Sequence, residues 1–185
     1  MQDTLYWIFP EHIEQDVIDL LLKKIENIPS HNGYIGQSNS LKPGKIDTDI
    51  RQVSCQSLSE YDFFCLMLMS FGLKANLQVW NYDVFCSNQC EVLSYNENGD
   101  KYDGHVDTLR IAPGVVRKLT ILAFLNNDYE GGKFFLMLDE RNKQYIETTP
   151  GTVLVFPSHI MHGVEPVTKG IRKSVVSWLV GPNFK

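Results

Sequence analysis

The sequence lacks the features that mark exported and membrane-bound proteins. No stretch approaches the roughly 18 apolar residues of a membrane span. The first residues, Met1 to Phe9, carry no lysine or arginine and no long apolar run. No internal repeat or low-complexity tract is visible either. We therefore expect a protein of the cytoplasm that has no signal peptide and no transmembrane segment.

Cysteine is scarce. The four cysteines, Cys55, Cys65, Cys86 and Cys90, include no C-x-x-C pair and are too few for a disulfide scaffold. This scarcity indicates reduced thiols. A metal site at Cys86 and Cys90 stays open as a minor alternative.

Basic charge is not in excess. Lysine and arginine together number 17, against 22 aspartates and glutamates, and the formal net charge is −5. Proteins that bind a phosphate backbone usually carry a basic surplus that neutralises the phosphates. The sequence therefore disfavours nucleic acid as the main partner, and it does not predict an oligomeric state.

Two segments in the first half of the chain have the pattern of helices. The first is predicted to begin at Pro10 and to run for about four turns, because its apolar residues are spaced by three and four. These residues are Ile13, Val17, Leu20, Leu21 and Ile25. The second is predicted over 58–73, with Ser57 or Ser59 as its cap and Gly72 near its end.

The segment 32–51 between the helices is rich in Gly, Ser, Asn, Lys and Asp, and predicts a long exposed loop between short strands. After Asn76 the composition changes to short β-rich runs separated by turns. The predicted strands are Leu77–Phe85, Glu91–Tyr95, Leu119–Leu125, Lys133–Leu138, Gln144–Thr148, Thr152–Phe156 and Lys173–Val180.

Seven or eight strands after two helices predict a mainly β fold of the α+β class. In such a fold an antiparallel double-sheet roll is supported by helices. The length of 185 residues and the 43% hydrophobic content suit one domain with a sizeable core. We expect supporting helices and a substrate loop in about 1–78 and the β core in about 79–185.

A His-x-Asp triplet, His105-Val106-Asp107, stands near the middle of the chain. Residues two apart on a strand face the same way, so both side chains could point into one cavity. Two imidazoles and one carboxylate on the same side of a metal form the facial triad of non-haem Fe(II) enzymes. Asp103-x-His105 has the same spacing, so the triplet alone does not fix the pair.

A third ligand is needed from farther along the chain. His159 follows Pro157-Ser158 in what reads as a turn, whereas His162 begins a segment that leads back into a strand. We favour His162 as the ligand. His159 is interpreted as a surface histidine or as one that supports the ligands.

Arg172 stands at the start of a predicted core strand, where a guanidinium is costly unless a carboxylate meets it. Strand alternation places Arg172, Ser174, Val176 and Trp178 on one face. Arg172 with Ser174 could therefore grip a bound carboxylate. A structural ion pair with a protein carboxylate remains the alternative.

Taken together, these residues resemble the 2-oxoglutarate- and iron(II)-dependent dioxygenases, in particular the prolyl-4-hydroxylase-like branch. The likeness runs from about Trp80 to Pro182. Its landmarks, in order, are Tyr95-x-x-x-Gly99-x-x-Tyr102-x-x-His105-x-Asp107, Arg117-x-x-Thr120, Phe124-Leu125-Asn126, Gly131-Gly132-x-Phe134, Pro150-Gly151, Phe156 and His162-Gly163-Val164-x-Pro166-Val167-x-x-Gly170-x-Arg172-x-Ser174. The resemblance implies a double-stranded β-helix of the jelly-roll, cupin-like kind.

The resemblance also implies roles for individual residues. His105, Asp107 and His162 would be the iron ligands, and Arg172 with Ser174 would bind the distal carboxylate of 2-oxoglutarate. Tyr95 matches a tyrosine that approaches this co-substrate. For both Tyr95 and Trp178, a plain core aromatic is an equal interpretation. The residues expected to contact substrate are Tyr102, Arg117, Trp178 and Arg51, of which Arg51 ends the loop thought to cover the substrate.

Two positions depart from the family pattern. Phe124 stands where several members have a tyrosine that reaches the distal carboxylate, and Val176 stands where some have a threonine. Their hydroxyls are lost, so either co-substrate binding is weaker or another group such as Thr120 supplies the third contact.

The resemblance implies an enzyme that hydroxylates an aliphatic C–H bond while 2-oxoglutarate is converted to succinate and CO2. Its cofactors would be Fe(II), 2-oxoglutarate and O2, with ascorbate as a reductant. A prolyl residue in a peptide or protein is the first choice of substrate. The alternatives are a free amino acid, another protein side chain, a small molecule, a modified nucleic acid, or a module that binds metal and 2-oxoglutarate without catalysis.

Overall fold

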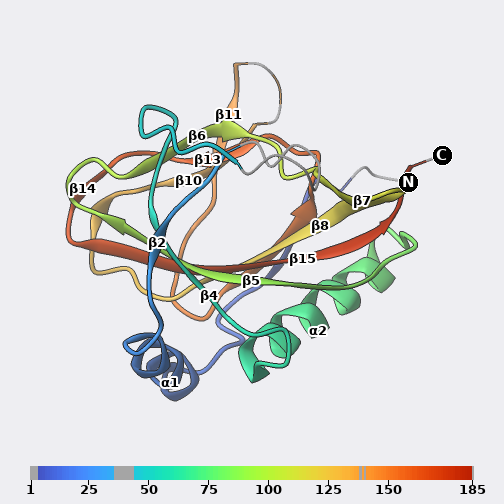
Figure 1. Cartoon of the computed structure of the whole chain (residues 1–185), viewed down its shortest axis with the longest axis horizontal. Helices are drawn as coiled ribbons and strands as arrows, with labels where there is room; N and C mark the ends of the chain where they lie inside the picture. The colour runs from blue at the N-terminus through green and yellow to red at the C-terminus, as the bar shows by residue number, and fades with distance from the viewer. Residues whose placement is uncertain (1–3, 36–43, 138, 140, 185) are drawn as a thin grey trace.

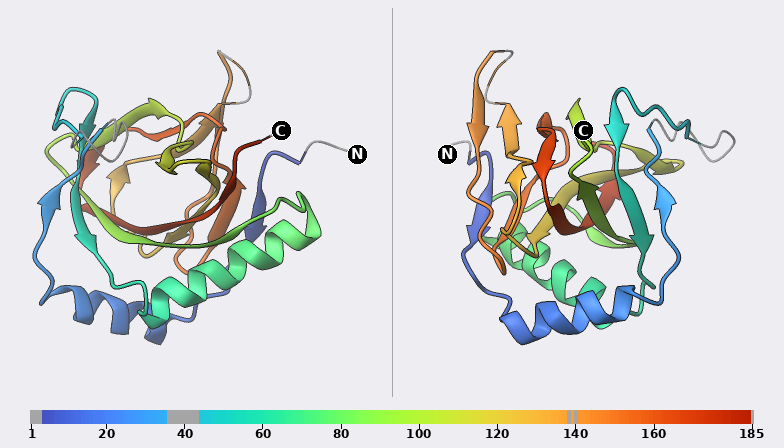
Figure 2. Two further views of the ribbon diagram at one scale, coloured as in Figure 1. Left: turned by 45° about the vertical axis from the view of Figure 1, so that its right-hand side comes forward. Right: turned by 90° about the vertical axis from the view of Figure 1, so that its left-hand side faces the viewer.

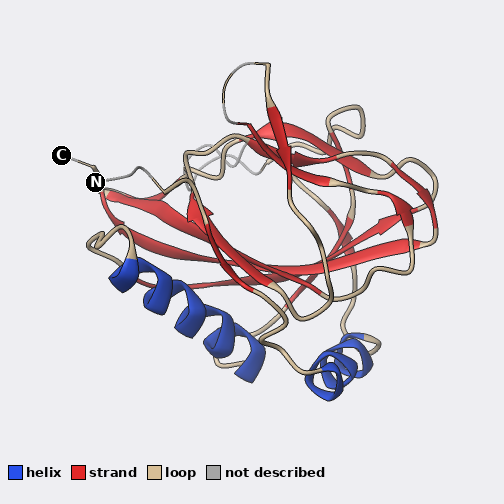
Figure 3. Cartoon of the chain, turned by 180° about the vertical axis from the view of Figure 1, so that it is seen from behind, coloured by secondary structure: helices blue, strands red, loops and turns tan. Residues whose placement is uncertain are grey.

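The computed structural model of the chain describes residues 4–35, 44–137, 139 and 141–184 (Figure 1). Two helices lie together on one side of the molecule, below a roll of strands. Figure 3 shows the same arrangement from behind, with both helices against the outside of the roll. No helix in the described part of the chain is long and apolar enough to cross a membrane.

Helix α1 spans Gln15–Ile25 and begins later than the predicted start at Pro10. The chain before it is still extended, because β1 (Trp7–Phe9) pairs with Val153–Val155 and Glu14 keeps an extended ψ of 153°. Asp16 lies in the first turn and Lys23 in the last, where each charge complements the helix dipole. The helix buries Ile18, Leu21 and Ile25.

Helix α2 spans Phe63–Gln78, about five residues later than the predicted 58–73. Its cap is Asp62, whose carboxylate accepts a hydrogen bond from Phe64 N at 3.1 Å, so the prediction of Ser57 or Ser59 as cap was wrong. Gly72 does not end the helix. It lies inside it, where a Cβ would come within 2.5 Å of Ile121, so the missing side chain lets α2 approach the sheet closely.

The predicted strand Leu77–Phe85 was also wrong. Its first two residues belong to α2, residues 79–84 have no regular structure, and the strand begins at Phe85. The other six predicted strands coincide with observed ones, with bounds that differ by a few residues. Leu138, at the end of one of them, lies outside the described residues. So do residues 36–43 of the predicted loop, whose described ends are flanked by short strands as expected.

The strands form two facing sheets and one small ribbon (Figure 2). The larger sheet has the order β1, β12 (Val153–Pro157), β8 (Val115–Phe124), β15 (Ile171–Pro182), β5 (Phe85–Asn96), β4 (Ser54–Ser57) and β2 (His31–Asn32), with β7 (Arg110–Ala112) paired to β8. The smaller sheet has the order β11 (Lys143–Tyr145), β10 (Phe134–Met137), β13 (His162–Val164), β6 (Lys101–His105) and β3 (Arg51–Gln52). The ribbon pairs β14 (Val167–Lys169) with β9 (Glu130–Gly131). All these pairings are antiparallel, and the predicted double-stranded β-helix supported by helices is confirmed.

The core consists of two clusters on opposite faces of the larger sheet. Val175 and Leu179 of β15 belong to the cluster that lies between the helices and the larger sheet. Val176 and Trp178 of the same strand belong to the cluster between the two sheets. This alternation is the one predicted for the strand after Arg172, and it places Arg172 and Ser174 inside the roll.

Candidate active site

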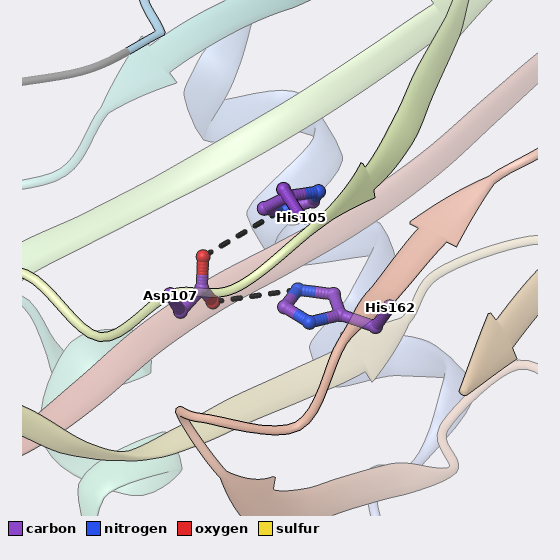
Figure 4. Close-up of side chains that lie close together, drawn as sticks. All are labelled: His105, Asp107 and His162. Atoms are coloured by element: carbon purple, nitrogen blue, oxygen red, sulfur yellow. Dashed lines mark ion pairs between the residues drawn. The ribbon is translucent and has the colours of Figure 1, made fainter. Parts of the chain in front are cut away.

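Three polar side chains converge inside the roll from the smaller sheet (Figure 4). His105 is the last residue of β6 and His162 is the first of β13, and the two are paired directly across the sheet. Asp107 follows two residues after His105, where its backbone N–H donates to Ser158 O at 2.8 Å. Strand pairing and one loop contact therefore set the positions of all three.

The three side chains could hold one metal ion. Their ligand atoms all lie within 4.8 Å of one another. Nε2 of His105 lies 3.5 Å from Oδ1 of Asp107, and Nε2 of His162 lies 3.5 Å from its Oδ2. Each Nδ1 is instead directed at a backbone carbonyl, Asp103 O or Ile160 O, at 2.9 Å. Such contacts place the ring proton on Nδ1 and leave Nε2 free to bind a metal.

The electrostatics of the site favour the protonation states that bind metals. Burial alone would raise the pKa of Asp107, but the imidazoles of His162 and His105 hold it well below its ordinary value. Burial and the nearby His162 lower the pKa of His105. An ionised carboxylate beside a neutral imidazole is what metal coordination requires.

The Asp107 carboxylate is held by two side chains of the larger sheet. Thr120 Oγ1 and Trp178 Nε1 both donate to its Oδ2, each at 2.9 Å. The Thr120 hydroxyl also shares a hydrogen bond with that of Ser158 at 3.0 Å. Thr120 thus has its hydrogen bonds to Asp107 and Ser158, although sequence reasoning placed it with the co-substrate.

Arg172 lies inside the same roll with most of its hydrogen-bonding capacity unused. Its residue is 1% exposed, and Nη1 donates to Ser174 Oγ at 3.1 Å. Nε and Nη2 are buried and have no hydrogen-bond partner among the described residues. The guanidinium carbon lies 5.3 Å from the Tyr95 ring and 5.7 Å from the Phe124 ring. A buried guanidinium in apolar surroundings requires an anion, and the unused N–H groups suit a carboxylate.

One cavity of about 290 Å³ connects these groups. It is lined by the residues to which the family resemblance assigned site roles: His105, Asp107, His162, Arg172, Ser174, Tyr95, Thr120, Tyr102, Arg117, Trp178 and Arg51. His159 is exposed with its ring near Phe184, and it does not line the cavity. Val176 lines the cavity as well. Phe124 does not line it, and its ring packs against that of Phe134.

Several lining residues were not found by sequence reasoning. Gln89 and Glu91 reach the cavity from β5, in a stretch with no motif to single them out. Ser158 was interpreted as a turn residue only, yet it contacts both Asp107 and Thr120. No grouping of three potential metal ligands in the described residues includes Cys86 or Cys90.

Comparison with known proteins agrees with this geometry. Residues 90–180 match the model of the 2OG-Fe(II) oxygenase superfamily. The chain carries a 2OG-Fe(II) oxygenase domain. The matched segment contains all three converging side chains and Arg172, and the cofactors of this family are Fe(II), 2-oxoglutarate and O2.

The relatives of this oxygenase domain include PKHD-type hydroxylases. One from Synechococcus sp. (strain CC9902) is 34% identical over 90 residues, which cover 48% of this chain and 40% of that protein. One from Gloeothece citriformis is 27% identical over 179 residues, which cover 92% of this chain and 73% of that protein. Among solved structures, a Trichoplax adhaerens prolyl hydroxylase in complex with a hypoxia inducible factor peptide fragment has a TM-score of 0.71 at 18% identity, covering 95% of this chain and 83% of that one.

The residues of this oxygenase domain fit the cofactors of the family. Two imidazoles and one carboxylate are the donor set of a non-haem Fe(II) site with open positions. The unpartnered Nε and Nη2 of Arg172 suit the distal carboxylate of 2-oxoglutarate. Both groups face one cavity, so iron and co-substrate could occupy it together.

Proposed function

We propose that this protein is a 2-oxoglutarate- and Fe(II)-dependent hydroxylase of an aliphatic C–H bond, with a prolyl residue of a peptide or protein as substrate. In this proposal His105, Asp107 and His162 hold the iron, and Arg172 holds the co-substrate. The observation that carries it is the convergence of the three ligand atoms beside a buried guanidinium that lacks partners. When bound, Fe(II) with 2-oxoglutarate and O2 supplies the oxidising chemistry, and succinate and CO2 are released.

The protein residues contribute orientation and charge. Thr120 and Trp178 both bind Oδ2 of Asp107, which fixes the carboxylate and leaves Oδ1 for the metal. The backbone carbonyls at Asp103 and Ile160 fix the rings of His105 and His162. Supports of this kind raise metal affinity because the ligands need not be reoriented on binding.

Arg172 and Ser174 would bind the end of 2-oxoglutarate that lies away from the iron. The guanidinium supplies a fixed positive charge and two nitrogens, Nε and Nη2, whose N–H groups have no partner in the described structure, and the Ser174 hydroxyl lies 3.1 Å from its Nη1. Phe124 and Val176 bring no hydroxyl to this end of the cavity. Recognition of the carboxylate therefore depends on Arg172 and Ser174, and Tyr95 packs beside them.

The choice of a prolyl substrate rests on likeness. The PKHD-type relatives are named hydroxylases, and the Trichoplax protein is a prolyl hydroxylase solved with a peptide. Tyr102, Arg117, Trp178 and Arg51 line the cavity near the ligands and are the proposed substrate contacts.

Mass spectrometry of a proline-containing peptide panel tests this proposal. The protein is incubated with each peptide, Fe(II), ascorbate, 2-oxoglutarate and air, and a matched reaction omits 2-oxoglutarate. We expect one peptide to gain a single oxygen only in the complete reaction. Succinate formed without oxygen gain in any prolyl peptide would reject the proposed prolyl substrate. No succinate in any reaction would reject the proposed 2-oxoglutarate-dependent activity.

A further inference from the structure

The unpartnered polar atoms inside the described part of the molecule are all on arginines of the cavity. The buried side-chain nitrogens without a hydrogen-bond partner belong to Arg51, Arg117 and Arg172. Native proteins leave few buried polar groups unpaired, so each one calls for an explanation. Arg172 is accounted for by the proposed 2-oxoglutarate, which leaves the other two arginines.

Arg51 is accounted for largely by its own loop. Its Nη1 donates to Tyr34 O at 2.6 Å, and its Nε lies so close to Gly33 that a Cβ there would be 2.6 Å away. Its Nη2 donates to Cys55 Sγ at 3.7 Å, so both terminal nitrogens already have partners. Arg51 therefore contributes positive charge to the cavity rather than an open hydrogen-bonding edge.

Arg117 is placed differently, close to the proposed metal. Its guanidinium carbon lies 3.6 Å from the ring of Trp178, whose indole N–H donates to Asp107. The same indole therefore contacts both the guanidinium and a proposed ligand carboxylate. Nη2 donates to Gln89 at 2.6 Å, while Nε has no partner in the described structure. A guanidinium that lies over an aromatic face keeps its N–H groups in its own plane, where they can still bind an anion.

The charge of Arg117 has no direct counter-ion among the described residues. No ion pair within 4.0 Å joins it to Asp107 or Glu91, the carboxylates that line the cavity with it. Both hydrogen bonds to Asp107 Oδ2 come from other side chains. Burial lowers the pKa of Arg117, although the carboxylates of Asp107 and Glu91 act in the opposite direction from a distance. A peptide carbonyl would satisfy the hydrogen bonds of Arg117 but bring no charge into direct contact with it, whereas a carboxylate would do both.

We infer that Arg117 binds a free α-carboxylate of the substrate, so that the hydroxylated unit is a free amino acid or the C-terminal residue of a peptide. This inference rests on the proposed Fe(II)- and 2-oxoglutarate-dependent hydroxylation, and it replaces an internal prolyl residue as substrate with a unit that carries a free α-carboxylate. The cavity of about 290 Å³ must take 2-oxoglutarate as well, so the two carboxylates would be held by separate arginines, Arg172 and Arg117, that line the same cavity.

Binding experiments with matched acids and amides test the inference. Calorimetric titrations use protein loaded with Fe(II) and 2-oxoglutarate, with O2 excluded so that no turnover occurs. The ligands are L-proline and L-prolinamide, the peptide Ala-Ala-Pro as acid and as amide, and an end-blocked peptide with an internal proline. We expect at least one acid to bind about tenfold or more tightly than its amide, because charge-assisted hydrogen bonds to a carboxylate are the stronger ones. L-proline and the peptide acid distinguish the two sources of the carboxylate.

Two variants connect the preference to Arg117. Arg117→Gln should bring acid and amide to equal affinity without changing the affinity for 2-oxoglutarate. Arg110→Gln, which removes an exposed arginine outside the cavity lining, should keep the preference of the wild type.

Three outcomes would overturn the inference: equal binding of acid and amide by the wild type, no binding of any acid, or a preference that survives in Arg117→Gln. The proposed function is judged separately. Hydroxylation of the end-blocked peptide with weak binding of the acids would reject the inference and leave the proposed function standing. A lack of succinate with every compound would reject the proposed function itself.

Discussion

At the scale of single residues, the site depends on the small number of contacts that position the carboxylate of Asp107. Its Oδ2 accepts two hydrogen bonds, from Thr120 and Trp178, and its backbone N–H is bound to Ser158. The carboxylate therefore has one oriented oxygen available for metal. Trp178 does two things at once, since its ring also lies under the guanidinium of Arg117.

Replacing Trp178 with phenylalanine should separate these two roles. The variant keeps an aromatic face for Arg117 but loses the indole N–H that donates to Asp107. We expect Fe(II) affinity to fall by about tenfold, at the low end of the effect of losing a group that orients a metal ligand. Anaerobic Fe(II) titration measures it. Trp80→Phe is the matched control, since it loses an indole hydrogen bond to Thr4 O outside the cavity lining. Equal affinities in both variants would show that Trp178 does not orient Asp107.

Replacing Arg172 with alanine should weaken co-substrate binding. The proposed bond to the distal carboxylate is charge-assisted, so its loss should raise the 2-oxoglutarate Kd by about ten- to a hundredfold. Lys173→Ala removes a neighbouring charge whose side chain points to the other face of β15. That control should bind 2-oxoglutarate like the wild type. An unchanged Kd in Arg172→Ala would mean that the carboxylate lies elsewhere.

At the scale of elements, the period-two pattern of β15 was interpreted correctly, whereas the ends of the helices and the strand predicted over Leu77–Phe85 were not. The alternation along β15 placed Arg172, Ser174, Val176 and Trp178 in the cavity, because a strand buried on both sides leaves each residue only two directions. Helix α2 gave no such signal. It is apolar nearly all round, with Phe64 and Leu68 buried and Leu77 exposed, so the sequence pattern could not fix its start or its end.

The residues of the site also fall into those that the sequence pattern predicts and those that it does not. His105 and His162 could be predicted because their residue types carry the chemistry. Gln89, Glu91 and Ser158 could not, since ordinary polar residues reach the cavity only through strand pairing and loop packing that the local sequence does not encode.

The start of α2 can be tested by mutation. Asp62 is 7% exposed, and its carboxylate caps α2 by accepting a hydrogen bond from Phe64 N. It also forms an ion pair with Lys24, in the last turn of α1. Asp62→Ala should lower the free energy of unfolding by about 1–2 kcal/mol, the effect of losing a good cap. Ser59→Ala, at the exposed position first predicted as cap, should change it by less than about 0.5 kcal/mol. Urea unfolding measures both. A larger effect at Ser59 would move the start of the helix back to the predicted place.

At the scale of the whole molecule, the cavity joins the two sheets. His105 and His162 belong to the smaller sheet, whereas Arg172, Thr120 and Trp178 belong to the larger one. A ligand that contacts iron at one end and Arg172 at the other would bridge both. Its binding energy should therefore appear in the stability of the entire fold.

Co-substrate should thus stabilise the iron-loaded protein as a unit. At a 2-oxoglutarate concentration about 100 times its Kd, the free energy of unfolding should rise by about 2.7 kcal/mol. Anaerobic denaturant unfolding with and without 2-oxoglutarate measures this rise. The same concentration of succinate serves as the control, because succinate lacks the keto group needed to chelate the metal. An equal rise with succinate, or none with 2-oxoglutarate, would contradict a ligand bound at both ends.

The most direct test of the central claim compares two histidines three residues apart. His162 lies within the converging triad, whereas His159 is exposed and does not line the cavity. Iron content and succinate formation from 2-oxoglutarate are measured for the wild type, His162→Ala and His159→Ala, each shown to be folded by circular dichroism. The account predicts that the wild type and His159→Ala bind one iron and form succinate, while His162→Ala does neither. Wild-type succinate formation in folded His162→Ala would contradict it.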